Sequence, residues 1–200
     1  MNRQSIRQIF SSPPTLETER LTLRKIRRSD ANDMFEYSKD PEVTRYLLWE
    51  PHPDKRYTSA YLADVMKRYR DGKFYDWGVI LRDEDKMIGT CGFTRFCPDD
   101  DSAECGYVLN RSYWGMGIAC EALFAVMNFG FTTLSLHRIE CRYMIENERS
   151  RRVTEKVGMT YEGTLRDAVR VGDRYRTVGV ASMLAREFFE KRGYIPNFQR

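Results

Sequence analysis

Residues 113 to 122 read YWGMGIACEA, and this stretch decides the expected fold. Two glycines, Gly115 and Gly117, flank a methionine, and an apolar run without another glycine or proline continues to Gly130. Backbone amides at a helix start lack a partner inside the helix, and the helix dipole adds about half a positive charge there. Glycine permits positive φ angles and close approach of a ligand to the backbone. The stretch therefore predicts a helix over 116–134 whose beginning can bind an anion.

A tight loop without any ligand would use the same two glycines. The stretch is neither GxGxxG nor a Walker sequence ending in Gly-Lys-Ser/Thr, and strands rather than a βαβ unit precede it. These differences argue against a dinucleotide or a nucleoside triphosphate as the anion.

The segments around the glycines predict one mixed sheet. Upstream, alternation and turn residues predict strands over 20–26, 74–81, 87–96 and 103–109, helices over 30–38 and 58–69, and a loop with a helical turn over 41–56. Downstream we expect a strand over 138–146, a helix over 147–157, and strands over 160–170 and 175–184 joined by a turn at 171–173. A meander followed by strand, helix and strand predicts a single α/β domain, mostly antiparallel, with helices on both faces.

The ends of the chain are expected to lie outside this domain. Residues 1–15 are polar and close with Ser-Ser-Pro-Pro, which favours a flexible N-terminal leader. The domain itself is expected to span 16–186, and 187–200 to form a C-terminal tail.

Composition limits the class of protein. The 200 residues are 42% apolar and 13% aromatic, which is enough for a sizeable core. No apolar run approaches 18 residues and no signal-peptide core is present, so we expect a cytoplasmic protein with no membrane partner. Five cysteines without a CxxC pair and only two histidines predict reduced thiols and no metal site. A net charge of +4 is too small to argue for nucleic acid.

The stretch LNRSYWGMGIACEA (109–122) resembles the acetyl-CoA-binding signature of the GNAT superfamily of N-acetyltransferases. It is most similar to the branch that acetylates N-terminal amines, such as that of alanine, on ribosomal proteins. Three more segments resemble this branch in the same order: TERLTLR (18–24), AECGYVLN (103–110) and NERSRRVTEKVGM (147–159). The superfamily usually has Gln or Arg where Trp114 stands, but this branch often has Trp. The resemblance implies acetyl-CoA as cosubstrate and a sheet that splays between the strands 103–109 and 138–146.

The resemblance also assigns residues to the cosubstrate. It implies that the pantetheine arm is held by the backbone of Tyr107, Val108 and Leu109. It implies that the pyrophosphate turn is formed by Trp114, Gly115, Met116, Gly117, Ile118 and Ala119. It also implies that the side chains of Asn147 and Arg152 contact the cosubstrate. Asn147 would equally serve as an ordinary helix cap, and Arg152 as a solvated surface charge.

Two residues are candidates for catalysis. Ser150, Val153 and Val157 share one helical face, so Ser150 is expected to look toward the sheet. In the branch that this chain resembles, the serine at this place is the proposed general acid for the CoA thiolate; the alternative is a hydroxyl bonded to the helix backbone. Glu104 is the candidate general base, or else a strand carboxylate paired with an arginine.

Other candidates for catalysis are weaker. Glu121 and Asp167 have ready explanations as a helix-start acid and a near-turn acid. A covalent route through Cys105, Cys120 or Cys141 is disfavoured because no histidine or evident cation adjoins them.

The acceptor is expected to be a primary amine attacked directly in a ternary complex. A protein α-amino group with a pKa of about 7.7–8.0 is roughly 10–20% neutral near pH 7, so it asks little of a base. The resemblance places Tyr46 and Trp49 on the wall of the acceptor cleft, although both would also suit core packing. The alternatives are a small amine (a polyamine, amino acid or aminoglycoside) and a CoA-binding or nucleic-acid-associated module without catalysis. A homodimer is left open.

Overall fold

The computed structural model describes residues 3–190 of the chain. Its helices are α1 (Arg3–Ser11), α2 (Ala31–Ser38), α3 (Pro41–Thr44), α4 (Lys55–Arg70), α5 (Ile118–Thr132), α6 (Glu148–Lys156) and α7 (Ala185–Glu190). Its strands are β1 (Leu16–Glu17), β2 (Leu21–Arg24), β3 (Asp76–Leu81), β4 (Lys86–Cys97), β5 (Ser102–Leu109), β6 (Arg138–Met144), β7 (Thr160–Val171) and β8 (Arg174–Leu184).

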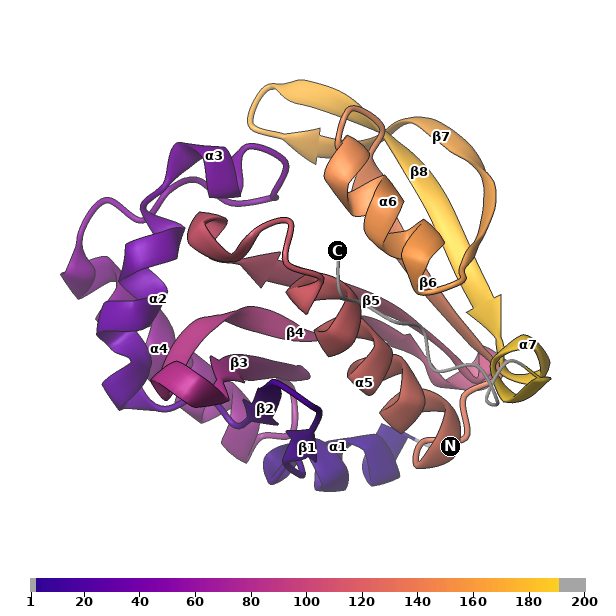
Figure 1. Ribbon diagram of the computed structural model, residues 1–200, viewed down its shortest axis with the longest axis horizontal. Coiled ribbons are helices and arrows are strands. Elements are labelled where there is room, and N and C mark those ends of the chain that lie inside the picture. Colours follow the sequence, from indigo (N-terminus) through magenta and orange to yellow (C-terminus); the bar gives the residue numbers. More distant parts are fainter. Residues whose placement is uncertain (1–2, 191–200) are drawn as a thin grey trace.

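The eight strands form one sheet in the order β1-β2-β3-β4-β5-β6-β8-β7. All neighbours pair antiparallel except β5 and β6, which are parallel because α5 crosses over between them (Figure 1). The predicted mixed, mostly antiparallel α/β sheet is confirmed.

The parallel pair separates partway along its length. β5 pairs with β6 only over residues 102–105 and 138–141, while β5 continues to Leu109 and β6 to Met144. Beyond Cys105 the free edge of β5 therefore faces a gap, and beyond Cys141 β6 pairs only with β8. This is the splay that the family resemblance implied.

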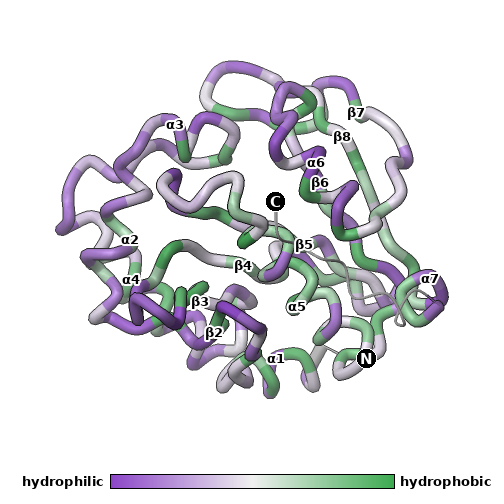
Figure 2. The backbone as a smooth tube through the Cα atoms, viewed as in Figure 1, coloured by the Kyte–Doolittle hydropathy of each residue, from purple (hydrophilic) through white to green (hydrophobic). Residues whose placement is uncertain are grey.

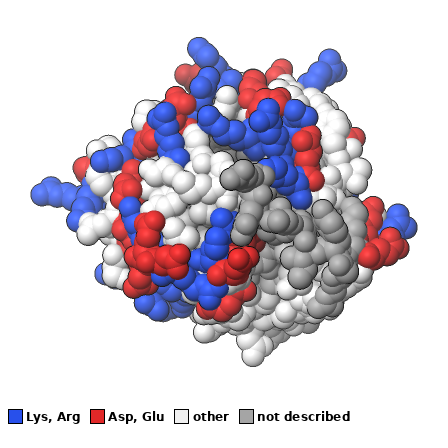
Figure 3. All heavy atoms as spheres, viewed as in Figure 1, with Lys and Arg blue, Asp and Glu red and all other residues white. Residues whose placement is uncertain are grey.

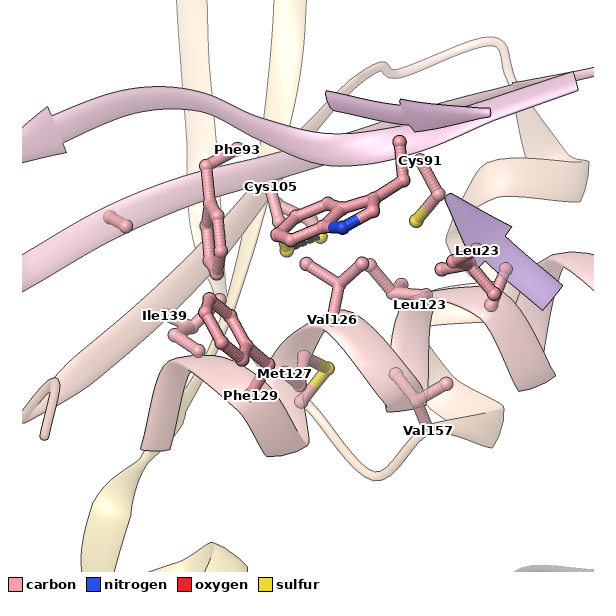
Figure 4. Packing of buried hydrophobic residues seen from close by; sticks show 14 of the residues in the cluster. Leu23, Cys91, Phe93, Cys105, Leu123, Val126, Met127, Phe129, Ile139 and Val157 are labelled. Carbon is pink, nitrogen blue, oxygen red and sulfur yellow. Dashed lines mark hydrogen bonds between the residues drawn. The ribbon is translucent and has the colours of Figure 1, made fainter. Parts of the chain in front are cut away.

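Alternation along the strands gives the sheet two apolar faces, and helices cover both. One face packs against α1, α5 and the end of α6, and the other against α2 and α4. In Figure 2 the hydrophobic colour follows α5 and the central strands, whereas the outer loops are hydrophilic. Figure 4 shows Leu123 and Val126 of α5 between their helix and the strands that carry Cys91 and Cys105.

The expected flexible leader over residues 1–15 is wrong for the residues that the structure describes. Residues 3–11 form α1, and Phe10 is fully buried against aromatic rings that include Trp77, Phe93 and Phe129. Ile6, one helical turn earlier, is buried too. Two apolar residues four apart hold the helix on the core, although its other residues are mostly polar.

The remaining boundaries differ from the predictions by a few residues. The helix expected over 58–69 begins earlier, at Lys55, because the Asp54 carboxylate accepts a hydrogen bond from the Tyr57 amide and caps it. The turn at 171–173 is present, with Gly172 at a φ of 56°. The expected tail begins inside α7, and its part beyond residue 190 lies outside the described residues.

Candidate active site

A cavity of about 570 Å³ opens where β5 and β6 separate. Its walls come from those two strands, the beginning of α6, the first residue of β3, the middle of β4, and the loop between α3 and α4. Residues of α2, α4, β7 and β8 complete them. It brings together seven of the residues that the sequence singled out: Tyr46, Trp49, Glu104, Tyr107, Val108, Asn147 and Ser150. The predicted cleft residues and the two predicted catalytic residues thus line one space.

Two hydroxyl groups meet at the start of α6. The Tyr107 hydroxyl donates a hydrogen bond to Ser150 Oγ at 3.2 Å. Asn147 caps the helix, because its Oδ1 accepts from the Ser150 amide at 3.2 Å. Val153 and Val157 turn toward the core on the same helical face, as the spacing predicted. Ser150 therefore points into the cavity with its own proton still available.

Glu104 lies in the cavity but already has partners. The Thr94 hydroxyl donates to its Oε1 at 3.0 Å, and Arg142 Nε lies 3.6 Å from its Oε2. Arg142 is held in turn by Glu140 at 2.9 Å. The pairing with an arginine that the sequence allowed is therefore present, while the role of Glu104 as a base stays a prediction.

The glycine turn lies at the end of β5, beyond the cavity walls. Gly115 and Gly117 have φ angles of 82° and 76°, and Gly117 directly precedes α5. Within the described chain, the amides of residues 116–119 donate no hydrogen bond to a backbone or side-chain acceptor. A row of unpartnered amides at the start of a 15-residue helix fits the pyrophosphate of a CoA molecule.

The Trp114 side chain stabilises the glycine turn. Its indole Nε1 donates to the Leu109 carbonyl at 2.8 Å, which ties the turn to the end of β5. The Arg149 guanidinium stacks over its ring at 4.5 Å from the centroid. Arg152 is exposed. It belongs to a cationic group on α6, and Figure 3 shows Lys and Arg side chains gathered over this helix.

Glu121 does not line the cavity, and its carboxylate makes structural contacts instead. Its carboxylate is buried in the first turn of α5 and accepts from Arg20 Nε at 2.7 Å and from the Thr18 hydroxyl at 2.6 Å. Arg20 Nη1 also donates to the Met116 carbonyl at 2.9 Å. The pair joins the segment before β2 to the glycine turn. Asp167 is exposed on β7, away from the cavity walls.

An aromatic group forms the wall opposite α6. Tyr46 is half-buried and Trp49 is 37% exposed, so Trp49 is not a core residue. His52, which the sequence patterns did not single out, is buried beside Trp49 and Tyr57 with ring centroids 5.2 and 4.8 Å away.

Two hydroxyl groups hold the His52 ring in place. Its Nδ1 lies 3.0 Å from Ser38 Oγ and 2.9 Å from Thr58 Oγ1. Burial lowers the pKa of His52, which favours the neutral imidazole.

Asp76 is a cavity residue that the sequence patterns did not reveal. It is the first residue of β3, it lines the cavity, and burial raises the pKa of its carboxyl group from 3.8 to about 7. In the sequence it stands before Trp77 in FYDWGVI, where an acid reads as an ordinary strand start. Only the register, which sets Gly92 of β4 beside it, reveals its place.

Burial disfavours the thiolate form of Cys91, Cys105 and Cys120. Cys105 and Cys141 lie with their Sγ atoms 3.1 Å apart at the last pair before the splay. Burial raises the pKa of Cys105 and, more modestly, that of Cys120. Across residues 3–190, no three His, Cys, Asp or Glu side chains are arranged to hold a metal ion. Among the described helices, none has the length and apolar character needed to cross a membrane.

Comparison with known proteins gives a consistent result. The acetyltransferase (GNAT) domain family matches residues 20–160. An uncharacterized N-acetyltransferase, p20, of Bacillus licheniformis is 37% identical over 174 residues, which cover 87% of this chain and 98% of that protein. The ribosomal protein uS5-alanine N-acetyltransferase of Escherichia coli is 27% identical, covering 80% and 86% of the two chains. A GNAT-family acetyltransferase structure from Bacillus anthracis superposes with a TM-score of 0.78 at 28% identity, covering 87% and 100%.

Proposed function

Because this chain belongs to the GNAT acetyltransferase family and is an N-acetyltransferase, we propose that its acceptor is the α-amino group at a protein N-terminus. Members of this family use acetyl-CoA as cosubstrate. The amine would attack the thioester directly in a ternary complex, with an alanine-type terminus of a ribosomal protein as the favoured class. The E. coli relative is an alanine N-acetyltransferase of ribosomal protein uS5, which supports this class.

The observation that carries the proposal is the contact between Tyr107 and Ser150 inside the cavity. Ser150 Oγ accepts a hydrogen bond from the Tyr107 hydroxyl, with 3.2 Å between the oxygens, so Ser150 can give its own proton to a departing thiolate. The free amides of residues 116–119 would hold the pyrophosphate beyond the end of β5. The backbone edge of β5 at Tyr107, Val108 and Leu109 would then lie between the pyrophosphate and Ser150. An acetyl group delivered along that edge would face Ser150.

The acceptor wall supports a peptide better than a small polycation. Tyr46, Trp49 and His52 give the cavity an aromatic, largely uncharged side. Among the described lining residues only Asp76 and Glu104 are acids, and Glu104 already adjoins Arg142. A polyamine would need several unpaired carboxylates.

A panel of acceptors tests the assignment. Purified protein is incubated with acetyl-CoA and peptides that begin with Ala, Ser or Met, in parallel with spermidine, free amino acids and an aminoglycoside, and free thiol is measured. We expect turnover with an Ala- or Ser-initiated peptide, and none with the same peptide carrying a blocked N-terminus. Turnover confined to a small amine would replace the acceptor class and keep the reaction. Binding of CoA with no turnover of any amine would favour the non-catalytic module.

A further inference from the structure

We propose that Asp76 is the catalytic residue that receives the acceptor's amino group: its carboxylate pairs with the ammonium form and takes the first proton from it. This inference rests on the proposed acetyl transfer. It also gives the acceptor a chemical class, a primary ammonium carried on a peptide or an otherwise uncharged chain end.

The register of the sheet directs Asp76 toward the splay. Asp76 pairs with Gly92 of β4, and Gly92 pairs with Gly106 of β5, so the three residues form a row across the sheet. A Cβ placed on Gly92 would lie 2.4 Å from Asp76 Oδ1. The aspartate side chain therefore lies over β4 itself, in the space that glycine leaves free.

The second glycine extends this space to β5. A Cβ at Gly106 would come within 3.2 Å of Thr94 Cγ2, on the side that faces the cavity. Neighbouring strands are about 4.8 Å apart, so a carboxylate over β4 is about one strand spacing from β5. An amino group fits between the carboxylate and the edge along which the thioester would lie.

Asp76 lacks the partners that occupy Glu104. No described residue donates a hydrogen bond to the Asp76 carboxylate, and no cationic side chain among those residues lies within 4.0 Å of it. No buried side-chain nitrogen or oxygen in residues 3–190 is left without a partner, so these carboxylate oxygens are open to the cavity rather than sealed. A half-buried carboxylate without a donor is costly unless a ligand supplies one.

The surroundings of Asp76 make it a base of suitable strength. Arg68 of α4 favours its charged form, but the guanidinium stacks on Phe74, 4.8 Å from the centroid, and the effect of burial is larger. The other titratable groups that face it are Tyr61 and Tyr69 from α4, Tyr37 from α2 and Cys91 from β4, with Glu104 of β5 and His52 in the same cavity. Burial raises the pKa of each of these tyrosines and of Cys91, so these four stay neutral around pH 7.

The proton balance of the step is then complete. One N–H bond of the ammonium breaks as the proton moves to Asp76, and the freed lone pair forms the C–N bond as the C–S bond breaks. Ser150 gives its proton to the thiolate. The second amine proton reaches Ser150 through solvent and restores its hydroxyl, while Asp76 releases its proton to solvent as the one net proton of the reaction.

The test compares the pH dependence of kcat/KM in wild type and Asp76→Asn, with an Ala-initiated hexapeptide as acceptor. Wild type needs an ionised Asp76 and a protonated amine, so we expect a bell with limbs near pH 7 and near the amine pKa of about 8. The variant can use only the neutral amine, so its profile should rise to a plateau above about pH 8 and lie about 10²-fold lower at neutral pH. Asp64→Asn, at an exposed position of α4, is the matched control and should keep the bell. A bell retained in Asp76→Asn overturns the proposal.

A second measurement does not depend on turnover. In protein labelled with ¹³C at the aspartate carboxyl carbons, one signal should titrate near pH 7 and be missing from Asp76→Asn. Saturating hexapeptide should move that titration to lower pH, because an ammonium favours the charged carboxylate. Titration at the ordinary aspartate value, or indifference to the peptide, overturns the role of Asp76. If the titration responds while no amine is acetylated, the proposed function fails and the amine site stands.

Discussion

The direction of one hydrogen bond decides which proton in the cavity is available. Tyr107 donates to Ser150 Oγ, so the serine is an acceptor in this contact and keeps its own O–H for another partner. Burial raises the pKa of Tyr107 well above its ordinary value, so the phenol is protonated around neutral pH. The two hydroxyls form a short relay that ends at Ser150.

This relay predicts a graded loss of activity. Ser150→Ala should lower kcat about 10²-fold, the low end for loss of a general acid, because the thiolate then leaves unprotonated. Tyr107→Phe should lower kcat only about tenfold, the worth of one hydrogen bond. Steady-state kinetics with the preferred acceptor measures both, with the KM for acetyl-CoA unchanged. Ser59→Ala, an exposed hydroxyl on α4, is the control. Full activity in Ser150→Ala would remove the serine from the chemistry.

The two carboxylates of the cavity differ in how far the sequence could predict them. Glu104 stands in a strand with clear alternation, so its facing follows from local pattern. Asp76 acquires its setting from Gly92, sixteen residues away, and from a cavity that forms only when the sheet assembles. Spacing along the chain carries no trace of that contact. A buried acid of this kind is found from register, not from pattern.

Among the elements, α1 is attached to the core by Ile6 and by the larger Phe10. Phe10 is fully buried among five aromatic rings. Phe10→Ala should reduce the free energy of unfolding by about 3–5 kcal/mol, measured by chemical denaturation. Gln8→Ala, on the exposed side of α1, is the control and should change it by less than about 0.5 kcal/mol. A small effect of Phe10→Ala would mean that α1 does not belong to the cooperative unit.

The error at α1 has a physical cause. A helix of nine residues is marginal in isolation, and its mostly polar composition hides a short apolar stripe, Ile6, Ile9 and Phe10, whose spacing is that of an amphipathic helix. The Ser-Ser-Pro-Pro segment does end it, so that inference about local structure was right. The missing information was tertiary, because Ile6 and Phe10 fill a space bounded by residues far along the chain.

A second contact between elements joins the N-terminal segment to the glycine turn. The Glu121 carboxylate is only 8% exposed, and Arg20 lies 2.6 Å from it while also holding the Met116 carbonyl. Arg20→Gln should destabilise the protein by about 3 kcal/mol, since it leaves a buried charge without its cation, and should weaken CoA binding measured by calorimetry. The Arg20→Gln/Glu121→Gln double variant should recover part of the stability. Equal losses in the single and double variants would show that the pair is not coupled.

Across the whole molecule, one face of the sheet serves core packing and the other serves the cavity. The face covered by α5 packs the large core, whereas the face covered by α2 and α4 carries Asp76, Gly106 and Glu104 toward the cavity. Period-two alternation along the strands is enough to predict such a division. The place where β5 and β6 part does not follow from alternation, because both strands continue with suitable residues; here the family resemblance supplied the answer.

A half-buried acid without a partner should also make the stability of the whole molecule depend on pH. The pKa of Asp76 is raised to about 7 in the folded state from an ordinary value of 3.8, so the folded protein holds this proton between those values while the unfolded chain has lost it. The free energy of unfolding must then fall as pH rises from about 4 to 7, by at most about 1.4 kcal/mol per pH unit for this group. His52 acts in the opposite direction, because burial lowers its pKa and stabilises the neutral form.

The difference in the free energy of unfolding between wild type and Asp76→Asn isolates the contribution of the aspartate. Asp76→Asn should therefore equal wild type near pH 4 and exceed it above pH 7, measured by denaturation at both pH values. A constant difference would mean that Asp76 ionises normally. Among the described residues that line the cavity, no other carboxylate without a hydrogen-bond donor would then be left to act as the base.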